Sequence, residues 1–175
     1  MLLAKKFIDK QIISLDEGRI VGVVKDFYLD QTLEHIVGLY LGSEGLLSRK
    51  PKLIKQDEIR LYGVDVLFVL NSSIVLEGSK LDQVEGLDTW RRREDLQGHA
   101  VESPTGEAIG KLEDIMFDEV GKVVGLGLSK IKIKGPIAEN QAIRRDVVIE
   151  VGDDKKPMVI DLVKAEQQNW FFQDK

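Results

Sequence analysis

Four aspartates stand at matching places in the two halves of the sequence and are the first candidates for chemistry. Asp26 and Asp30 in the first half correspond to Asp114 and Asp118 in the second. Carboxylates of this kind could act as general acids or bind a metal ion. We give more weight to a structural role, because a carboxylate also accepts hydrogen bonds from backbone amides that a bulge or turn leaves unpaired.

The other residue types offer little for catalysis. The chain has two histidines and no cysteine, which excludes disulfides, thiolate catalysis and cysteine-bound metal sites. His35 falls in a predicted turn and His99 at the start of a predicted strand, and neither belongs to a pattern typical of a nucleophilic triad. Neither common type of glycine-rich phosphate loop occurs. We therefore expect no enzyme, no catalytic residue, no metal and no cofactor.

Basic and aromatic residues are better candidates for binding a partner. Basic residues cluster at 49–55, 91–93 and 130–134, where they could bind RNA or an acidic protein, or protect strand edges from aggregation. In the middle cluster three arginines follow a tryptophan, a combination that is common at protein interfaces. The candidate partner-binding residues are Val23, Tyr40, Trp90, Arg91, Arg92, Arg93, Trp170, Phe171 and Phe172.

The composition is that of an ordinary soluble protein. Of 175 residues, 43% are hydrophobic and 31% are charged. The net charge of -5 argues against a dedicated binder of duplex DNA. The longest apolar run, residues 66–70, is far shorter than a membrane span, and no targeting segment is visible. We expect a cytoplasmic protein that neither spans a membrane nor binds DNA.

The chain contains an internal repeat. Three segments of the first half recur in the same order in the second half: 18–30 as 106–118, 36–41 as 123–128, and 59–65 as 148–154. Three ordered matches at nearly one spacing indicate two copies of one structural unit.

The sequence of each copy predicts a set of short strands. β-branched and aliphatic runs bounded by turn residues are typical of strands, and in the first copy they occur at 12–14, 20–29, 36–41, 59–61 and 66–70. Gly18 and Gly106 end predicted hairpin turns, where a glycine can take a positive φ. The buried face changes parity near residues 113–114, which predicts a β-bulge. Such a strand bends as a small barrel requires, and Gly22 and Gly110 would allow close packing at the bend.

This pattern resembles the PRC-barrel family, whose motif is a G-x-x-x-G opening, an acid four residues on, a hydrophobic pair and a turn acid. The matching residues are Gly18, Gly22, Asp26 and Asp30 in the first copy and Gly106, Gly110, Asp114 and Asp118 in the second. The resemblance implies an all-β fold of two tandem small, strongly bent antiparallel barrels. The expected parts are a first barrel (1–70), a linker with a helical turn (71–94), a second barrel (95–162) and a C-terminal tail (163–175).

The family includes the cytoplasmic barrel of the photosynthetic reaction centre H subunit and the C-terminal domain of a ribosome maturation factor. Neither specific role carries over, because this chain shows no membrane helix and has a second barrel in place of the factor's RNA-facing domain. The resemblance implies a non-enzymatic adaptor or assembly module that binds another protein or a second copy of itself. The alternative is an RNA- or ribosome-associated maturation factor that uses the basic clusters. The apolar outer wall of the first barrel should be covered by the linker near 81–87, by the second barrel, by the aromatic tail or by a second copy of the chain.

Overall fold

The computed structural model describes residues 1–44 and 50–168, which form a β-rich structure with a few short helices. The strands are β1 (Leu2–Leu3), β2 (Gln11–Ser14), β3 (Ile20–Val23), β4 (Asp26–Leu29), β5 (Ile36–Glu44), β6 (Lys50–Lys55), β7 (Ile59–Tyr62), β8 (Val66–Val69), β9 (Arg91–Arg92), β10 (Ala100–Glu102), β11 (Ala108–Phe117), β12 (Val123–Ser129), β13 (Ala142–Arg144), β14 (Val148–Glu150) and β15 (Met158–Ile160). The α-helices are α1 (Arg93–Leu96), α2 (Pro136–Asn140) and α3 (Leu162–Gln167). The 3-10 helices are η1 (Ala4–Phe7), η2 (Gln56–Glu58), η3 (Ser72–Ile74), η4 (Gly78–Gln83), η5 (Leu87–Thr89) and η6 (Arg145–Val147).

The two halves of the chain share one strand order. In the second half the order is β13-β12-β11-β10-β15-β14, and in the first it is β6-β5-β4 in one sheet and β3-β2-β8-β7 in another. The two orders agree when β3 and β4 are taken as the two parts of a strand equivalent to β11. The one parallel pair of each half also corresponds, because β2 pairs with β8 as β10 pairs with β15. Among the described residues no sheet closes on itself, so the closed barrels that the sequence suggested are not seen.

The long second strand of each copy is bent where the sequence predicted a bulge. In the register of β11 and β12, Leu112 faces Leu128 and Asp114 faces Gly127, so Glu113 is left out of the ladder. In the first copy the strand is interrupted at the same place, because two residues, Val24 and Lys25, separate the end of β3 from the start of β4. This confirms the bulge that the parity of the sequence predicted. At this bend Asp114 is only 2% exposed.

The hairpin turns that precede these strands use the two predicted glycines. Gly18 and Gly106 both have a left-handed backbone, with φ of 62° and 83°. Each turn is fastened by a serine hydroxyl at its start, Ser14 or Ser103, which accepts a hydrogen bond from a backbone amide of the turn. A side chain with a Cβ would be strained at either glycine, since L-residues rarely adopt this region.

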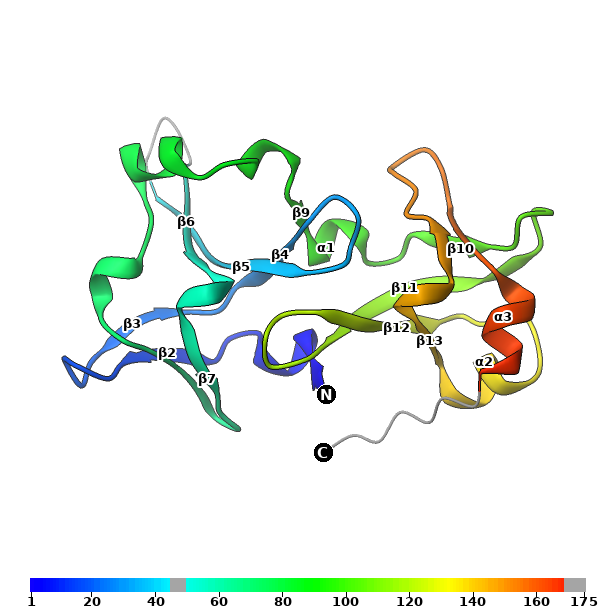
Figure 1. The fold of residues 1–175 in the computed structure, drawn as a ribbon, viewed down its shortest axis with the longest axis horizontal. Coiled ribbons are helices and arrows are strands. Elements are labelled where there is room, and N and C mark those ends of the chain that lie inside the picture. Colours follow the sequence, from blue (N-terminus) through cyan, green and yellow to red (C-terminus); the bar gives the residue numbers. More distant parts are fainter. Residues whose placement is uncertain (45–49, 169–175) are drawn as a thin grey trace.

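The two halves exchange their leading segments. The N-terminal strand β1 pairs with β11 of the second half, with Leu2 opposite Phe117, and β9 pairs with β4 of the first half, with Arg91 opposite Leu29. A short helix follows each of these strands, η1 in one case and α1 in the other. Figure 1 shows the N-terminus near the middle of the molecule, where the two halves meet. Each copy is therefore completed by the segment that precedes the other copy.

Reciprocal contacts join the halves at this centre. The amide of Ile36 donates to the carbonyl of Gly121 at 2.7 Å, and the amide of Val123 donates to the carbonyl of Glu34 at 2.7 Å. One hydrophobic core runs through both halves. Within it, the rings of Phe27 and Phe117 lie 5.5 Å apart. The two halves are thus joined by matching hydrogen bonds and by one shared core.

The second half contains two α-helices, α2 and α3, that the sequence did not predict, because it predicted a helical turn only in the linker. Residues 131–134, expected to continue a strand, lie outside β12, because Lys130 has a left-handed backbone with φ of 49° and ends the strand. Pro136 then begins α2, a position at which proline loses no helical hydrogen bond. The helix α3 is capped by Asp161, whose carboxylate accepts from the amide of Lys164 at 2.9 Å.

Candidate partner-binding pocket

The linker covers the outer wall of the first copy. Tyr28, Leu53 and Leu81 form a buried cluster there, with Tyr40 and Trp90 packed against it. The ring of Tyr28 lies 5.7 Å from that of Trp90 and 5.9 Å from that of Tyr40. The linker was one of the covers that the sequence offered for this wall, and the structure shows it packed on Tyr40, whereas the apolar run 66–70 is covered only in part, with Leu67 and Val69 buried and Leu70 40% exposed.

Beneath this cover, Asp26 is held by the exchanged segment. Its carboxylate is completely buried and accepts hydrogen bonds from Nε of Arg92 at 3.3 Å, Nε of Arg93 at 3.0 Å and the amide of Glu94 at 3.0 Å. Arg92 also bonds the carboxylate of Glu94 at 2.8 Å, and its guanidinium lies 4.0 Å from the ring centroid of Tyr40. The buried charge is therefore compensated by cations and by an amide, as buried carboxylates require.

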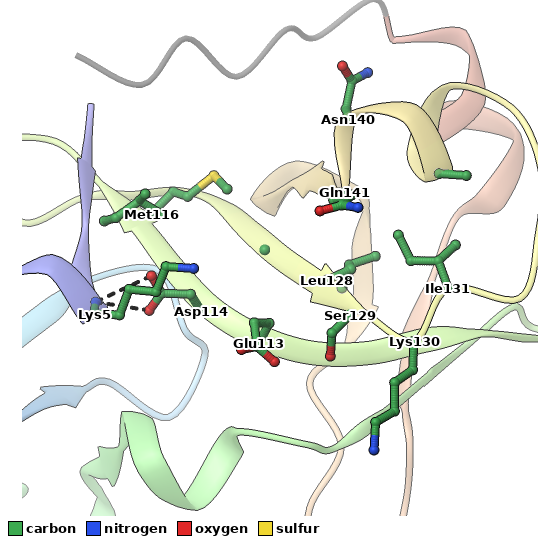
Figure 2. A pocket seen from close by; sticks show the side chains of 13 residues that line it. Lys5, Glu113, Asp114, Met116, Leu128, Ser129, Lys130, Ile131, Asn140 and Gln141 are labelled. Carbon is green, nitrogen blue, oxygen red and sulfur yellow. Dashed lines mark hydrogen bonds between the residues drawn. The ribbon is translucent and has the colours of Figure 1, made fainter.

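The equivalent acid of the second copy has a sparser set of partners. Asp114 accepts from the amide of Lys5 at 3.2 and 3.3 Å, and Figure 2 shows these two bonds. The nearest guanidinium nitrogen is Nη1 of Arg93, which is 3.7 Å from Oδ1. Burial raises the pKa of Asp114 above its ordinary value, and the amides of Ile115 and Lys5 and the charge of Arg93 oppose this rise only in part.

Strand register shows which side chains differ between the two sites. Asp26 faces Tyr40 in the first copy, whereas Asp114 faces Gly127 in the second. On the other side, Arg92 pairs with a residue of β4, and Leu3 occupies the matching place on β11. The second copy thus lacks both the aromatic ring and the guanidinium that fill the first site.

A pocket lies where these groups are missing. It has a volume of about 630 Å³, within the usual range for sites that bind small molecules or side chains. Its lining includes Leu3, Asp114, Met116, Gly127, Ser129 and Gln141. Figure 2 shows the amide side chains from the end of α2 above the strands and Asp114 at one side. The pocket therefore combines an apolar floor with one buried acid and several neutral polar groups.

The exposed lysines stand at the edge of this pocket. In Figure 2 the side chain of Lys130 extends away from Asp114, whereas the side chain of Lys5 runs beside it. Lys5 lies at the position that Glu94 holds in the first copy, because both residues donate their backbone amide to the equivalent aspartate. The pocket thus has a cation at its rim where the first site has an acid.

The structure places most of the predicted partner-binding residues in internal contacts. Arg92 and Arg93 bind Asp26, and Nη1 of Arg91 donates to the carbonyl of Gly152 at 3.0 Å. Tyr40 and Trp90 pack within the covered wall, and Val23 is half-buried on β3. Residues 170–172 lie outside the described residues. A partner-binding role for these side chains stays a prediction, but the three arginines already have partners within the chain.

The residues with predicted structural roles occupy matching places. Oδ1 of Asp30 accepts from the amide of Glu34 at 2.8 Å, and Oδ1 of Asp118 accepts from the amide of Lys122 at 2.8 Å. Both acids thus close the turn that leads into the next strand. The buried pair Asp26 and Asp114 behaves differently, because the backbone amides of the exchanged segments are among their partners, and not only amides of the bend.

The glycines at the bend lie against neighbouring strands. A Cβ on Gly110 would lie 2.9 Å from the carbonyl oxygen of Ser129, closer than real Cβ contacts. A Cβ on Gly22 would meet the Cδ1 atom of Leu41 at 3.0 Å. The close packing expected at these positions therefore involves the backbone in the second copy and a side chain in the first.

Comparison with known proteins identifies one of the two copies. Residues 91–167 match the family model of the PRC-barrel domain, so this part of the chain is a PRC-barrel domain. The match includes β9 to α3 and most of the pocket lining. No curated protein is significantly similar to the chain. Within residues 1–44 and 50–168, no helix has the length and apolar character needed to cross a membrane.

Proposed function

We propose that the chain is a non-enzymatic protein-binding adaptor that docks a partner protein at the open pocket of its PRC-barrel domain. One observation carries this proposal. The added strand is present in both copies, as β9 on β4 and as β1 on β11, but only in the first does its side chain Arg92 fill the space beside the acid, where it contacts Tyr40 and Asp26. In the second copy Leu3 and Gly127 leave that space open, so a partner can fill it with a side chain.

We further infer that the first half is a second PRC-like barrel, with parts at 1–70, 71–94, 95–162 and 163–175. The common strand order, the matching parallel pairs and the matching acids support this inference. The first copy then serves as a partner of the PRC-barrel domain within one chain, and it leaves the pocket side of the second copy free for an outside partner.

A protein partner is favoured over RNA by the positions of the arginines. The cluster at 91–93 was one of the three candidates for RNA contacts, yet its guanidiniums bind a carboxylate and a backbone carbonyl within the chain. The lysines at 130, 132 and 134 are exposed, but the whole chain carries a net charge of -5. An adaptor that acts inside the cell also agrees with the sequence-based expectation of a cytoplasmic location.

Affinity purification at two salt concentrations tests this function. The full chain, tagged and expressed in its native host, would be recovered from lysate at low and at high salt, with and without nuclease. We expect a specific protein to remain bound at high salt after nuclease treatment, because apolar docking depends weakly on salt and phosphate binding depends on it steeply. Recovery of RNA that is lost at high salt, with no protein retained, would contradict the proposal.

A single substitution links the captured protein to the pocket. Gly127→Tyr restores the ring found at the equivalent place in the first copy, and a Cβ fits there because its nearest neighbours are 3.6 Å away. We expect this variant to lose the captured protein. Val64→Ser, at a position that is 85% exposed and distant in the fold, serves as the matched control and should retain it.

A further inference from the structure

The geometry points to an arginine side chain as the group that the pocket receives, an inference that rests on the proposed function and names the chemistry of the partner. The occupant is an arginine of another protein, inserted beside Asp114 between Gly127 and Leu3. The argument comes from the first copy, where the same place is occupied.

The first copy shows what this site holds when it is full. The guanidinium of Arg92 lies over Tyr40 at 4.0 Å, bonds Asp26 at 3.3 Å and bonds Glu94 at 2.8 Å. A planar guanidinium suits this environment, because it can stack on a ring and bond two carboxylates at once. The first site therefore favours an arginine over a simple ammonium; the second copy keeps its carboxylate as Asp114 and has Gly127 and Lys5 in place of Tyr40 and Glu94.

The second copy keeps the acid and lacks the arginine. Asp114 is as deeply buried as Asp26, but Leu3 stands where Arg92 would be, and Ala4 follows it where Arg93 would be. The carboxylate has the amides of Ile115 and Lys5 and, at 3.7 Å, Nη1 of Arg93, a guanidinium that already bonds Asp26 at 3.0 Å. A second guanidinium would supply the compensation that the buried charge lacks.

The space and the neighbouring groups suit the same ligand. Gly127 leaves open the volume that the Tyr40 ring fills in the first copy, and Ser129, Asn140 and Gln141 add oxygen atoms that can accept from a guanidinium. Figure 2 shows these side chains around the space next to Asp114. The apolar floor of Leu3 and Met116 can hold the methylene groups of an arginine stem.

Lys5 and Lys130 line the pocket and oppose a cation; the side chain of Lys130 extends away from Asp114, so Lys5 is the residue to test. Its ammonium stands where the first copy has the carboxylate of Glu94, which bonds Arg92. The side chain of Lys5 is exposed and can move into solvent, while its backbone amide keeps the bond to Asp114. Lys5→Glu would therefore remove a repulsion and add an acceptor, so it should strengthen the binding of arginine.

The experiment is an NMR titration of the full, isotopically labelled chain with N-acetyl-arginine amide, with N-acetyl-lysine amide as the comparison ligand. We expect saturable shift changes confined to the residues that line the pocket, at ligand concentrations of the order of millimolar, as is usual for so small a ligand. Lys5→Glu should tighten binding several-fold. Gly127→Tyr and Leu3→Arg should each abolish it, the first by filling the space and the second by supplying an internal guanidinium, whereas Val64→Ser should bind as the parent does.

Several outcomes would overturn the inference. These are the absence of saturable shifts, equal shifts in the parent and in Gly127→Tyr, and equal affinity for the lysine and arginine amides. The failure of the proposed function is distinguishable from this. If Gly127→Tyr loses the captured protein while the arginine amide does not bind, the adaptor stands and the arginine is wrong; if no protein is captured at any salt, the adaptor itself is wrong.

Discussion

The two copies treat the same buried acid in opposite ways. In the first, Asp26 is closed off by two arginines, an amide and a layer of aromatic rings, whereas in the second Asp114 faces a pocket. The backbone frame is the same in both, since the strand order, the bend and the turn acids correspond. The difference teaches that the same arrangement of strands can enclose a buried acid or leave it beside a pocket, depending on a few side chains around that acid.

Arg93 explains why both acids are buried at the centre. Its Nε bonds Asp26 at 3.0 Å while its Nη1 lies 3.7 Å from Asp114, so one guanidinium lies between the acids of both copies. The equivalent residue of the other exchanged segment is Ala4, which is fully buried. The single arginine thus makes the two copies unequal and favours the first copy.

The largest expected difference between the copies concerns the acids themselves. Asp26→Asn removes the charge that two arginines face and leaves Arg93 buried beside a neutral group. We expect a loss of about 3–5 kcal/mol of unfolding free energy, the usual cost of removing one partner of a buried ion pair. Asp114→Asn should lose no more than about 1–2 kcal/mol, because its main partner is a backbone amide, with which an asparagine oxygen can still bond.

Chemical denaturation of the two variants, with fitted unfolding free energies, checks this prediction. Equal losses for Asp26→Asn and Asp114→Asn would show that the arginines contribute nothing in the first site and would remove the basis of the comparison.

A smaller difference in unfolding free energy is expected between substitutions of the two glycines at the bend, Gly22 and Gly110. Gly110→Ala places a Cβ 2.9 Å from a backbone carbonyl, so strands β11 and β12 must separate, at a cost of about 1–3 kcal/mol. Gly22→Ala meets only the end of the Leu41 side chain, which can rotate, and should cost less than about 1 kcal/mol. Thermal unfolding of both variants measures this order, and the opposite order would show that the close packing lies in the first copy.

The smallest expected effect is a pH dependence of the unfolding free energy that comes from Asp114. Because the pKa of Asp114 is raised on folding, its burial penalises the native state at neutral pH, and this penalty disappears as pH falls through the raised pKa toward the ordinary value. Asp114→Asn carries no such penalty at any pH. The stability of the parent relative to this variant should therefore increase as pH is lowered.

Asp146 provides a control, because its pKa is shifted in the opposite direction and the expected change of stability with pH is reversed. Burial raises its pKa, but hydrogen bonds and charges from Arg144 and Lys164 outweigh this and leave the pKa below its ordinary value. The parent should thus lose stability relative to Asp146→Asn as pH falls. Thermal unfolding across a range of pH measures the stability of the parent relative to each variant. If the difference from Asp114→Asn changes with pH in the same direction as the difference from Asp146→Asn, the assignment of a raised pKa to Asp114 is contradicted.

The sequence contained enough to predict the elements of each copy. The repeated glycines and acids located the hairpins, and the change of parity at 113–114 located the bulge, because these features depend on local backbone geometry. A comparison of equivalent positions predicted the apolar wall around Tyr40, but it left open which of several segments covers it, and the structure shows the linker there. The helices α2 and α3 were missed, since the repeat gave no counterpart for them.

The exchange of the leading segments and the pocket could not be predicted in this way. Residues 2–7 and 91–96 occupy equivalent places, yet one is mostly apolar with two lysines and the other is rich in arginine and acid, so no repeat is visible. The exchanged-segment amides that bond Asp26 and Asp114, those of Glu94 and Lys5, lie 68 and 109 positions away along the chain. The difference between Tyr40 and Gly127 was a usable signal, but it indicates a pocket only when Gly127 is known to face Asp114.

The most direct test of the comparison is an experimental structure of the full chain grown with N-acetyl-arginine amide. Density for one guanidinium beside Asp114, with Asp26 still bound by Arg92 and Arg93, is the result that this account predicts. An empty pocket at saturating ligand, or a Tyr-sized side chain from elsewhere in the chain filling the space at Gly127, would contradict it.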